Sequence, residues 1–202
     1  MKHIDTSIPL KKDKLLEAAL SLMLAKGYHG TTVDEICVQA GVTKGSFFHY
    51  FKSKEDVGKA AIEQFERLQL HFIAEAGLNG IHDPLEKLHA FLDFFSEMAS
   101  NPDSPSSCLV AVMTQELAET SEVFRALCEE KLLNNTKLLK SIFDELSLTT
   151  PALKLDGQQL ADYFFSTYQG SLILAKARND REVIKCNIEY FRQYISCLLN
   201  NH

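Results

Sequence analysis

Apolar residues recur every three or four positions along most of the chain, and the strict alternation of a β-strand is nearly absent. This spacing is typical of amphipathic α-helices with one buried face. In residues 11–26 it places Leu15, Ala19 and Met23 on the same face, and Gly27 then provides a C-cap. The sequence therefore predicts an all-α protein.

Two short helices follow the first one. Thr32 supplies an N-cap hydroxyl and Glu35 stands three residues later, which is the spacing of a capping box and opens a helix over residues 33–40. Gly41 ends that helix, and Thr43 caps a third one that ends near residue 51.

Longer helices make up the remainder of the chain. They are predicted over residues 54–75, 84–101, 108–118, 121–146, 156–178 and 180–199. The segment 102–107, rich in proline and serine, is the most loop-like in the chain. The predicted architecture is three short helices joined to a larger helical body.

Residues 32–51 have the organisation of a helix-turn-helix motif. Gly41 can adopt the left-handed conformation that the sharp turn requires, and Cys37 is small enough for the two helices to cross one turn earlier. The apolar residues that would hold this crossing together are Ile36, Ala40, Val42 and Phe47. A helical hairpin within a larger core is the alternative, but helices this short make poor bundle members.

Charge is unevenly divided along the chain. A hydrophobic content of 46% with 24% charged residues excludes a disordered chain. The net charge is −6, yet residues 1–60 hold nine lysines and no arginine against seven carboxylates, a net charge of +2. A mildly basic N-terminal module on an acidic body follows from this asymmetry.

Localisation and catalysis are constrained mainly by what the sequence lacks. Five scattered cysteines without a CxxC pair favour a reducing compartment, and no apolar run is long enough for an export signal or a membrane span. We therefore expect a cytoplasmic protein. Hydrolase, metalloprotease, P-loop and dinucleotide-binding motifs are absent, and the histidines show no metal-ligand spacing with cysteine. The sequence predicts neither an enzyme nor a metal or cofactor site.

The N-terminal segment resembles the TetR family of bacterial transcriptional regulators over roughly residues 11–60. The matching motifs are Thr31-Thr32-Val33, Ile36, Ala40-Gly41-Val42, Lys44-Gly45, His49-Tyr50-Phe51 and Ser53-Lys54-Glu55. The resemblance implies a homodimer whose N-terminal domains occupy successive major grooves of DNA. It also implies a helical body that encloses a small-molecule pocket and the dimer interface. The domains would span residues 1–53 and 54–202, with helix 54–75 linking them.

The resemblance implies a set of DNA-contacting residues: Thr31, Thr43, Lys44, Gly45, Phe48, His49, Tyr50 and Lys54. Thr31 and Thr43 would donate to phosphates at helix N-termini, and Lys44 would reach a phosphate or a base edge. Phe48 stands where the family usually has tyrosine, which removes one phosphate hydrogen bond. The alternative for each polar residue is a solvated surface position.

Aromatic residues and methionines of the body are candidates for a hydrophobic ligand pocket, with core packing as the alternative. The predicted pocket residues are Phe91, Phe95, Met98, Met113, Phe124, Phe143, Phe165, Tyr168 and Gln169. Stripes on the last two helices predict the dimer interface, with packing inside one chain as the alternative. The predicted interface residues are Tyr163, Thr167, Ser171, Ile184, Ile188, Phe191 and Ile195.

These observations favour a ligand-responsive, DNA-binding transcriptional regulator. We expect a homodimeric repressor that a small hydrophobic effector releases from a palindromic operator, because the effector prefers a body conformation that binds DNA poorly. The alternative is a helical small-molecule-binding or protein-interaction module that does not read DNA.

Overall fold

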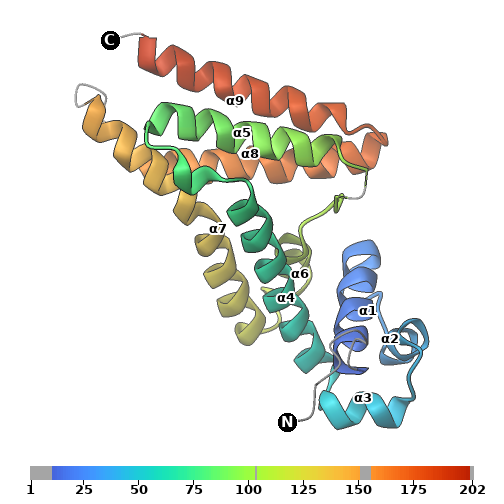
Figure 1. Cartoon of the computed structure of the whole chain (residues 1–202). Coiled ribbons are helices and arrows are strands. Elements are labelled where there is room, and N and C mark those ends of the chain that lie inside the picture. The colour runs from blue at the N-terminus through green and yellow to red at the C-terminus, as the bar shows by residue number, and fades with distance from the viewer. Residues whose placement is uncertain (1–10, 103, 151–155, 201–202) are drawn as a thin grey trace, which may run out of the picture. The chain divides into compact units, whose positions relative to one another are not determined.

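The computed structural model describes residues 11–102, 104–150 and 156–200, and every regular element in these ranges is helical (Figure 1). The elements are α1 (Lys11–Lys26), α2 (Val33–Ala40), α3 (Lys44–Tyr50), α4 (Lys54–Glu75), the 3₁₀ turn η1 (Leu78–Gly80), α5 (Pro84–Ser100), α6 (Leu109–Leu117), α7 (Glu122–Thr149), α8 (Gly157–Arg178) and α9 (Glu182–Asn200). The all-α prediction is confirmed, and the helix boundaries agree with the predicted ones to within a few residues.

The chain forms two compact units. The first unit comprises the residues up to 68 together with 109–129, and the second comprises 69–108 together with the residues from 130 onward. A boundary at residue 53 therefore does not coincide with these units. Helix α6 and the start of α7 belong to the first unit, in which α6 contacts α1, and α4 and α7 each supply residues to both units.

Local capping explains why α2 begins and ends where it does. The Thr32 hydroxyl accepts a hydrogen bond from the Glu35 backbone N–H, and the Glu35 carboxylate accepts one from the Thr32 N–H at 2.9 Å, so the capping box is complete. Gly41 has φ +65° and ends the helix in the left-handed conformation. The predicted helix-turn-helix is thus present, with Phe47 of α3 fully buried at the crossing.

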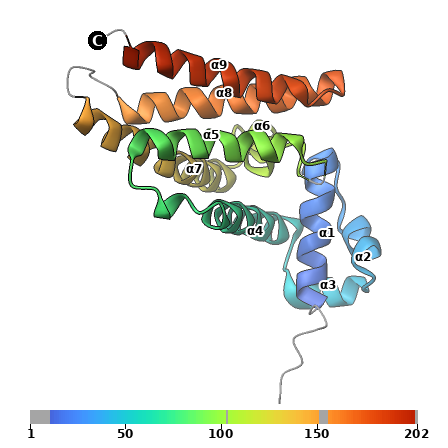
Figure 2. The same ribbon diagram turned by 45° about the horizontal axis from the view of Figure 1, so that its top comes forward.

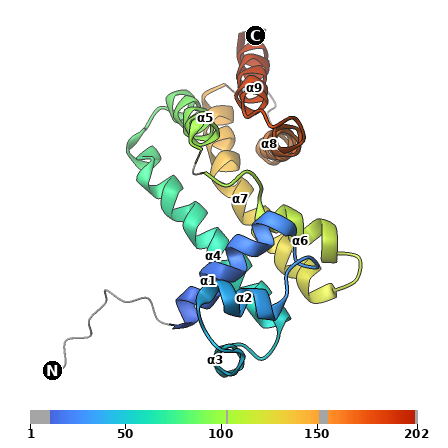
Figure 3. The ribbon, with the colours of Figure 1, turned by 90° about the vertical axis from the view of Figure 1, so that its right-hand side faces the viewer.

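In the second unit α5, α8 and α9 run side by side (Figures 1 and 2), and Figure 3 shows them close to end-on. Their contact is largely aromatic. The ring centroids of Phe95 and Phe164 are 5.3 Å apart and those of Phe164 and Phe191 are 5.1 Å apart, both in edge-to-face geometry. Such pairs add to the stabilisation that burial of the rings already provides.

The structure corrects the predicted dimer stripe on α9. Ile184, Ile188, Phe191 and Ile195 are all buried within the protomer, where they face α5 and α8. Ser171 of α8 is also buried, and its hydroxyl donates to the Thr167 carbonyl. These residues do form one apolar stripe, but the stripe is part of the core of the second unit.

Arg181 joins three backbone carbonyls at the end of α5. Its guanidinium donates to the carbonyl oxygens of Ala99 at 2.8 Å, Met98 at 3.1 Å and Ser104 at 3.1 Å. The last carbonyls of a helix have no partner within the helix, so a planar fork of donors placed there satisfies several at once. Arg181 therefore fixes the α8–α9 corner to the end of α5.

We expect Arg181→Ala to lower the free energy of unfolding by about 1–3 kcal/mol, because it leaves partly buried carbonyls without donors. Urea or thermal unfolding followed by circular dichroism measures the change. Arg178→Ala, at an exposed arginine in the last turn of α8, is the matched control and should have little effect. Equal losses in the two variants would contradict the role assigned to Arg181.

Candidate nucleic-acid interface

Helix α3 presents an exposed face while its opposite face is anchored in the core. Phe47 is fully buried, whereas the adjacent Phe48 is 52% exposed and Tyr50 is 38% exposed. His49 is exposed too, and its ring lies edge-on to Tyr50 with centroids 4.8 Å apart. Figure 1 shows α3 at the outer edge of the group that it forms with α1 and α2. The structure thus brings Phe48, His49 and Tyr50 together on one accessible helix.

The N-terminus of α3 is built by Thr43, whose hydroxyl accepts a hydrogen bond from the Ser46 N–H at 3.2 Å. Lys44 and Gly45 follow directly and are exposed. A Cβ placed on Gly45 would meet only the Thr43 hydroxyl oxygen, at 3.9 Å. Glycine disfavours a helix by about 1 kcal/mol relative to alanine, and no close contact within the chain requires it here.

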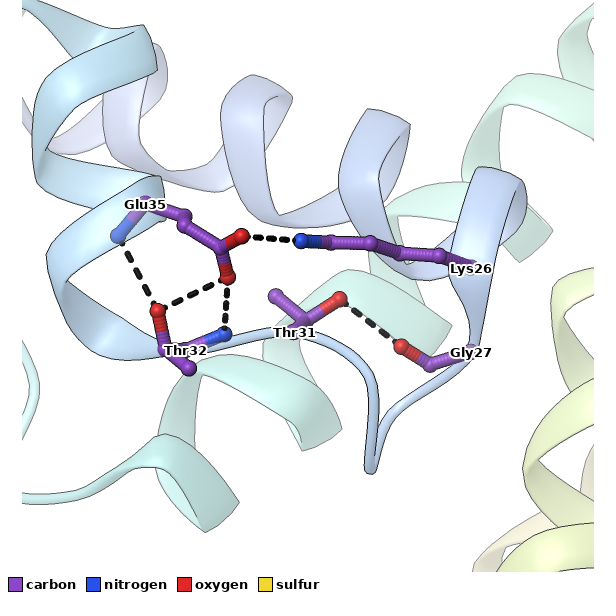
Figure 4. A network of polar contacts seen from close by, with 5 residues as sticks. All are labelled: Lys26, Gly27, Thr31, Thr32 and Glu35. Carbon is purple, nitrogen blue, oxygen red and sulfur yellow. Dashed lines mark hydrogen bonds and ion pairs between the residues drawn. The ribbon is translucent and has the colours of Figure 1, made fainter.

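Thr31 differs from its predicted role. Its side chain is fully buried, and the hydroxyl donates to the Gly27 carbonyl at 2.7 Å (Figure 4). A buried hydroxyl that already donates cannot reach a phosphate, so the structure contradicts a phosphate contact from Thr31. Its function is to close the turn between α1 and α2.

Lys54 stands at the start of α4 with its Nζ 4.3 Å from the centroid of the Tyr28 ring. This is a cation–π geometry. Burial is the main cause that lowers the pKa of Lys54, and burial likewise raises the pKa of Tyr28. Lys54 is therefore held in place by Tyr28 within the same unit as α3.

The turn after α1 is held by residues that come from far along the chain. The Glu116 carboxylate of α6 accepts a hydrogen bond from the His29 backbone N–H at 2.7 Å. The Phe124 ring of α7 lies 5.4 Å from that of Tyr28, and a Cβ on Gly58 would come within 3.1 Å of Tyr28. The sequence does not predict this role of Glu116, because a local pattern cannot reveal a hydrogen-bond partner 87 positions away.

The predicted ligand residues are divided between the two units. Met113 and Phe124 belong to the first unit, where both are buried, and Phe124 packs on Tyr28 instead of lining a pocket in the body. In the second unit Phe91, Phe95 and Phe143 are buried core residues. Met98, Phe165 and Gln169 are only partly buried.

The second unit has a shallow hollow between α8 and α9 that is too tight to admit a water molecule. It is lined by Phe164, Thr167, Tyr168, Ser171, Asn187, Ile188 and Phe191. Of the predicted ligand residues, Tyr168 lines it, and burial raises the pKa of Tyr168 to about 12. Ligand pockets typically enclose about 300–1,000 Å³, so this hollow is not a ligand pocket in the structure as it stands.

Among the residues that the structure describes, no three His, Cys, Asp or Glu side chains come together as metal ligands. In the same part of the chain, no helix combines the length and the apolar character needed to cross a membrane.

Models of known protein families match both the N-terminal and the C-terminal part of the chain. A model for bacterial regulatory proteins of the tetR family matches residues 15–62, and one for the C-terminal domain of LmrA/YxaF-like transcriptional regulators matches residues 84–188. The chain belongs to the TetR family. It is accordingly a DNA-binding transcriptional regulator with an N-terminal helix-turn-helix and a C-terminal helical domain.

Individual TetR-family relatives match over most of their length. The transcriptional regulator AcuR of Cereibacter sphaeroides is 31% identical over 168 residues, covering 83% of this chain and 77% of AcuR. The transcriptional repressor DhaR of a Mycobacterium species is 26% identical over 183 residues, covering 85% of each chain. The crystal structure of a regulatory protein TetR from Rhodobacter sphaeroides gives a TM-score of 0.77 at 29% identity, covering 91% of this chain and 97% of that one.

A network of charged groups supports the start of α2 (Figure 4). The Glu35 carboxylate pairs with the Lys26 ammonium and also accepts from the Thr32 hydroxyl and N–H. The hydrogen bond from Lys26, followed by those from Thr32, lowers the pKa of Glu35 to about 2. Because the folded state favours the carboxylate, this contribution to stability is present above the usual pKa of 4.5 and is lost as pH falls toward about 2.

We expect Glu35→Gln to lower the thermal midpoint at pH 7, because the pair with Lys26 and part of the capping box are lost. The difference from the natural protein should shrink as pH is lowered from about 5 toward about 3, where the carboxylate of the unfolded chain takes up a proton. Circular dichroism at several pH values measures it, with Glu17→Gln at an exposed position of α1 as control. A difference that stays constant over this range would contradict the assignment.

Proposed function

We propose that this TetR-family regulator is a homodimeric repressor whose two α3 helices bind successive major grooves of a palindromic operator, and that a small hydrophobic effector releases it. The observation that carries the DNA-binding surface is the exposed face of α3, anchored by the buried Phe47. An α-helix fits the major groove, where its side chains reach base edges. Relatives such as DhaR are named repressors, which supports the direction of regulation.

Three features of α3 support its role as the recognition helix. Gly45 is a glycine that no close contact within the chain requires, which is understandable if the backbone must approach the groove closely. Tyr50 and His49 offer hydrogen-bonding groups beside the apolar ring of Phe48, which can contact a thymine methyl. The Thr43 hydroxyl and the N-terminus of α3 suit a phosphate.

The proposed dimer interface is the accessible face of α8 and α9 that flanks the stripe buried in the core. On α8, Tyr163, Thr167 and Leu174 recur at helical spacing, and none of them is buried. On α9, Tyr190 and Tyr194 are exposed, and the Tyr194 ring lies 5.5 Å from that of Tyr163. Large apolar side chains gathered on two adjacent helices are typical of a protein interface.

The proposed effector site lies in the second unit, which holds the aromatic cluster and the shallow hollow at Tyr168. The polar groups of Thr167 and Asn187 beside the Phe164 and Phe191 rings suit a small, mainly apolar compound with one hydrogen-bonding group. Because the hollow is closed as it stands, a bound compound must spread α8 and α9. Such a compound would favour a second conformation of the body, as release from DNA requires.

We expect Lys44→Ala and Tyr50→Ala each to weaken operator binding by at least about 1 kcal/mol, because both remove contacts from the start and the end of α3. The thermal midpoint should stay unchanged, since both side chains are exposed. Fluorescence titration of an operator duplex, selected from a random pool by the natural protein, measures the change. Unaltered affinity in both variants would remove α3 from the interface.

We expect Leu174→Glu to convert the dimer into a monomer that keeps its native helicity, because an unpaired carboxylate in an apolar interface is strongly unfavourable. Leu174 is 39% exposed, so the protomer itself should tolerate the change. The control is Leu148→Glu at an exposed leucine of α7. Analytical ultracentrifugation at low concentration decides, and a Leu174→Glu variant that remains dimeric would place the interface elsewhere.

A further inference from the structure

The first lysine of the recognition helix is already paired with a carboxylate. Lys44 Nζ lies 2.7 Å from Asp34 Oδ1, and the two side chains are 58% and 70% exposed. Asp34 comes from the first turn of α2 and Lys44 from the first position of α3, so the pair bridges the turn at Gly41. The Lys44 ammonium donates a hydrogen bond to the Asp34 carboxylate, and this bond raises the pKa of Lys44.

Asp34 and the adjacent Glu35 each hold a lysine from a different helix. Glu35 closes the capping box with Thr32 and pairs with Lys26 of α1. Asp34 takes no part in the capping box and pairs with Lys44 of α3. By neutralising Lys44, Asp34 reduces the attraction of that lysine for phosphate.

We propose that Asp34 competes with DNA phosphate for the Lys44 ammonium and thereby sets the specificity of the regulator for its operator. This inference rests on the proposed contact between Lys44 and DNA. A phosphate that binds Lys44 must replace the Asp34 carboxylate as its partner. This exchange gains less than binding to an unpaired lysine would, so contacts to phosphate alone are weakened.

The consequence differs between random DNA and the operator. On random DNA, binding depends almost entirely on the neutralisation of phosphates by basic side chains. Pairing one lysine with a carboxylate therefore weakens this binding by the full contribution of that lysine. On the operator, side chains of α3 also contact base edges, and these contacts do not involve Asp34. Asp34 therefore lowers non-specific binding more than operator binding and raises the ratio between them. The small positive charge of residues 1–60 is consistent with this arrangement.

The test uses the full-length chain in four forms: the natural protein, Asp34→Asn, Lys44→Ala and the double variant. Fluorescence anisotropy with a labelled mixed-sequence duplex and with the selected operator duplex, over a series of NaCl concentrations, gives affinities and salt slopes. Glu17→Gln, an equal change of charge at an exposed position of α1, is the matched control. Thermal midpoints verify folding, and Asp34→Ser serves as a second variant if Asp34→Asn is unstable.

We expect Asp34→Asn to tighten binding to the mixed-sequence duplex about two- to five-fold at low salt. The salt slope should steepen by up to about one, and the operator affinity should rise less. In the Lys44→Ala background the gain should vanish, since Asp34 acts through Lys44.

A gain equal to that of Glu17→Gln, or one that persists in the Lys44→Ala background, would overturn the proposal and show a general charge effect. An equal gain on both duplexes would overturn the claim of specificity. These failures differ from failure of the proposed function, in which the natural protein would select no operator and Lys44→Ala would leave DNA binding unchanged.

Discussion

The burial of Phe47 at the crossing of α2 and α3 is the constraint on which the DNA-binding surface depends. Gly41 turns the chain in the left-handed conformation, and the capping hydroxyls of Thr32 and Thr43 decide where each short helix starts. With Phe47 fixed inside, Phe48 faces outward, because neighbouring positions on a helix point about 100° apart. A helix too short to be stable alone thus gains a fixed orientation from one buried ring.

Charged groups change how strongly this surface attracts DNA, whereas the buried ring and the helix caps determine its geometry. Lys26 and Lys44 are paired with carboxylates of α2, and Lys54 lies over the Tyr28 ring. A DNA-binding protein with a net negative charge and few unpaired cations near the DNA depends more on base contacts for its affinity. The small positive charge of residues 1–60 thus agrees with a regulator that must distinguish its operator from the many non-specific sites of a genome.

Local signals were readable from the sequence, and distant partners were not. The capping box, the Gly41 turn and the start of α3 each depend on residues within four positions, so pattern alone located them. The stripe on α9 showed which face is buried but not what covers it, so Ile188 was assigned to a partner chain instead of the chain's own core. Glu116 and Arg181 bind backbone groups far along the chain, and Thr31 matched a motif while its hydroxyl points inward.

Hydroxyl-radical footprinting on the selected operator duplex tests the central claim most directly. Two α3 helices related by a two-fold axis should protect two backbone segments about 10 base pairs apart, or a multiple of that spacing, on one face of the DNA. The two patches should be related by the symmetry of the sequence. A single protected patch, or protection without that symmetry, would contradict a dimer that reads DNA through paired α3 helices.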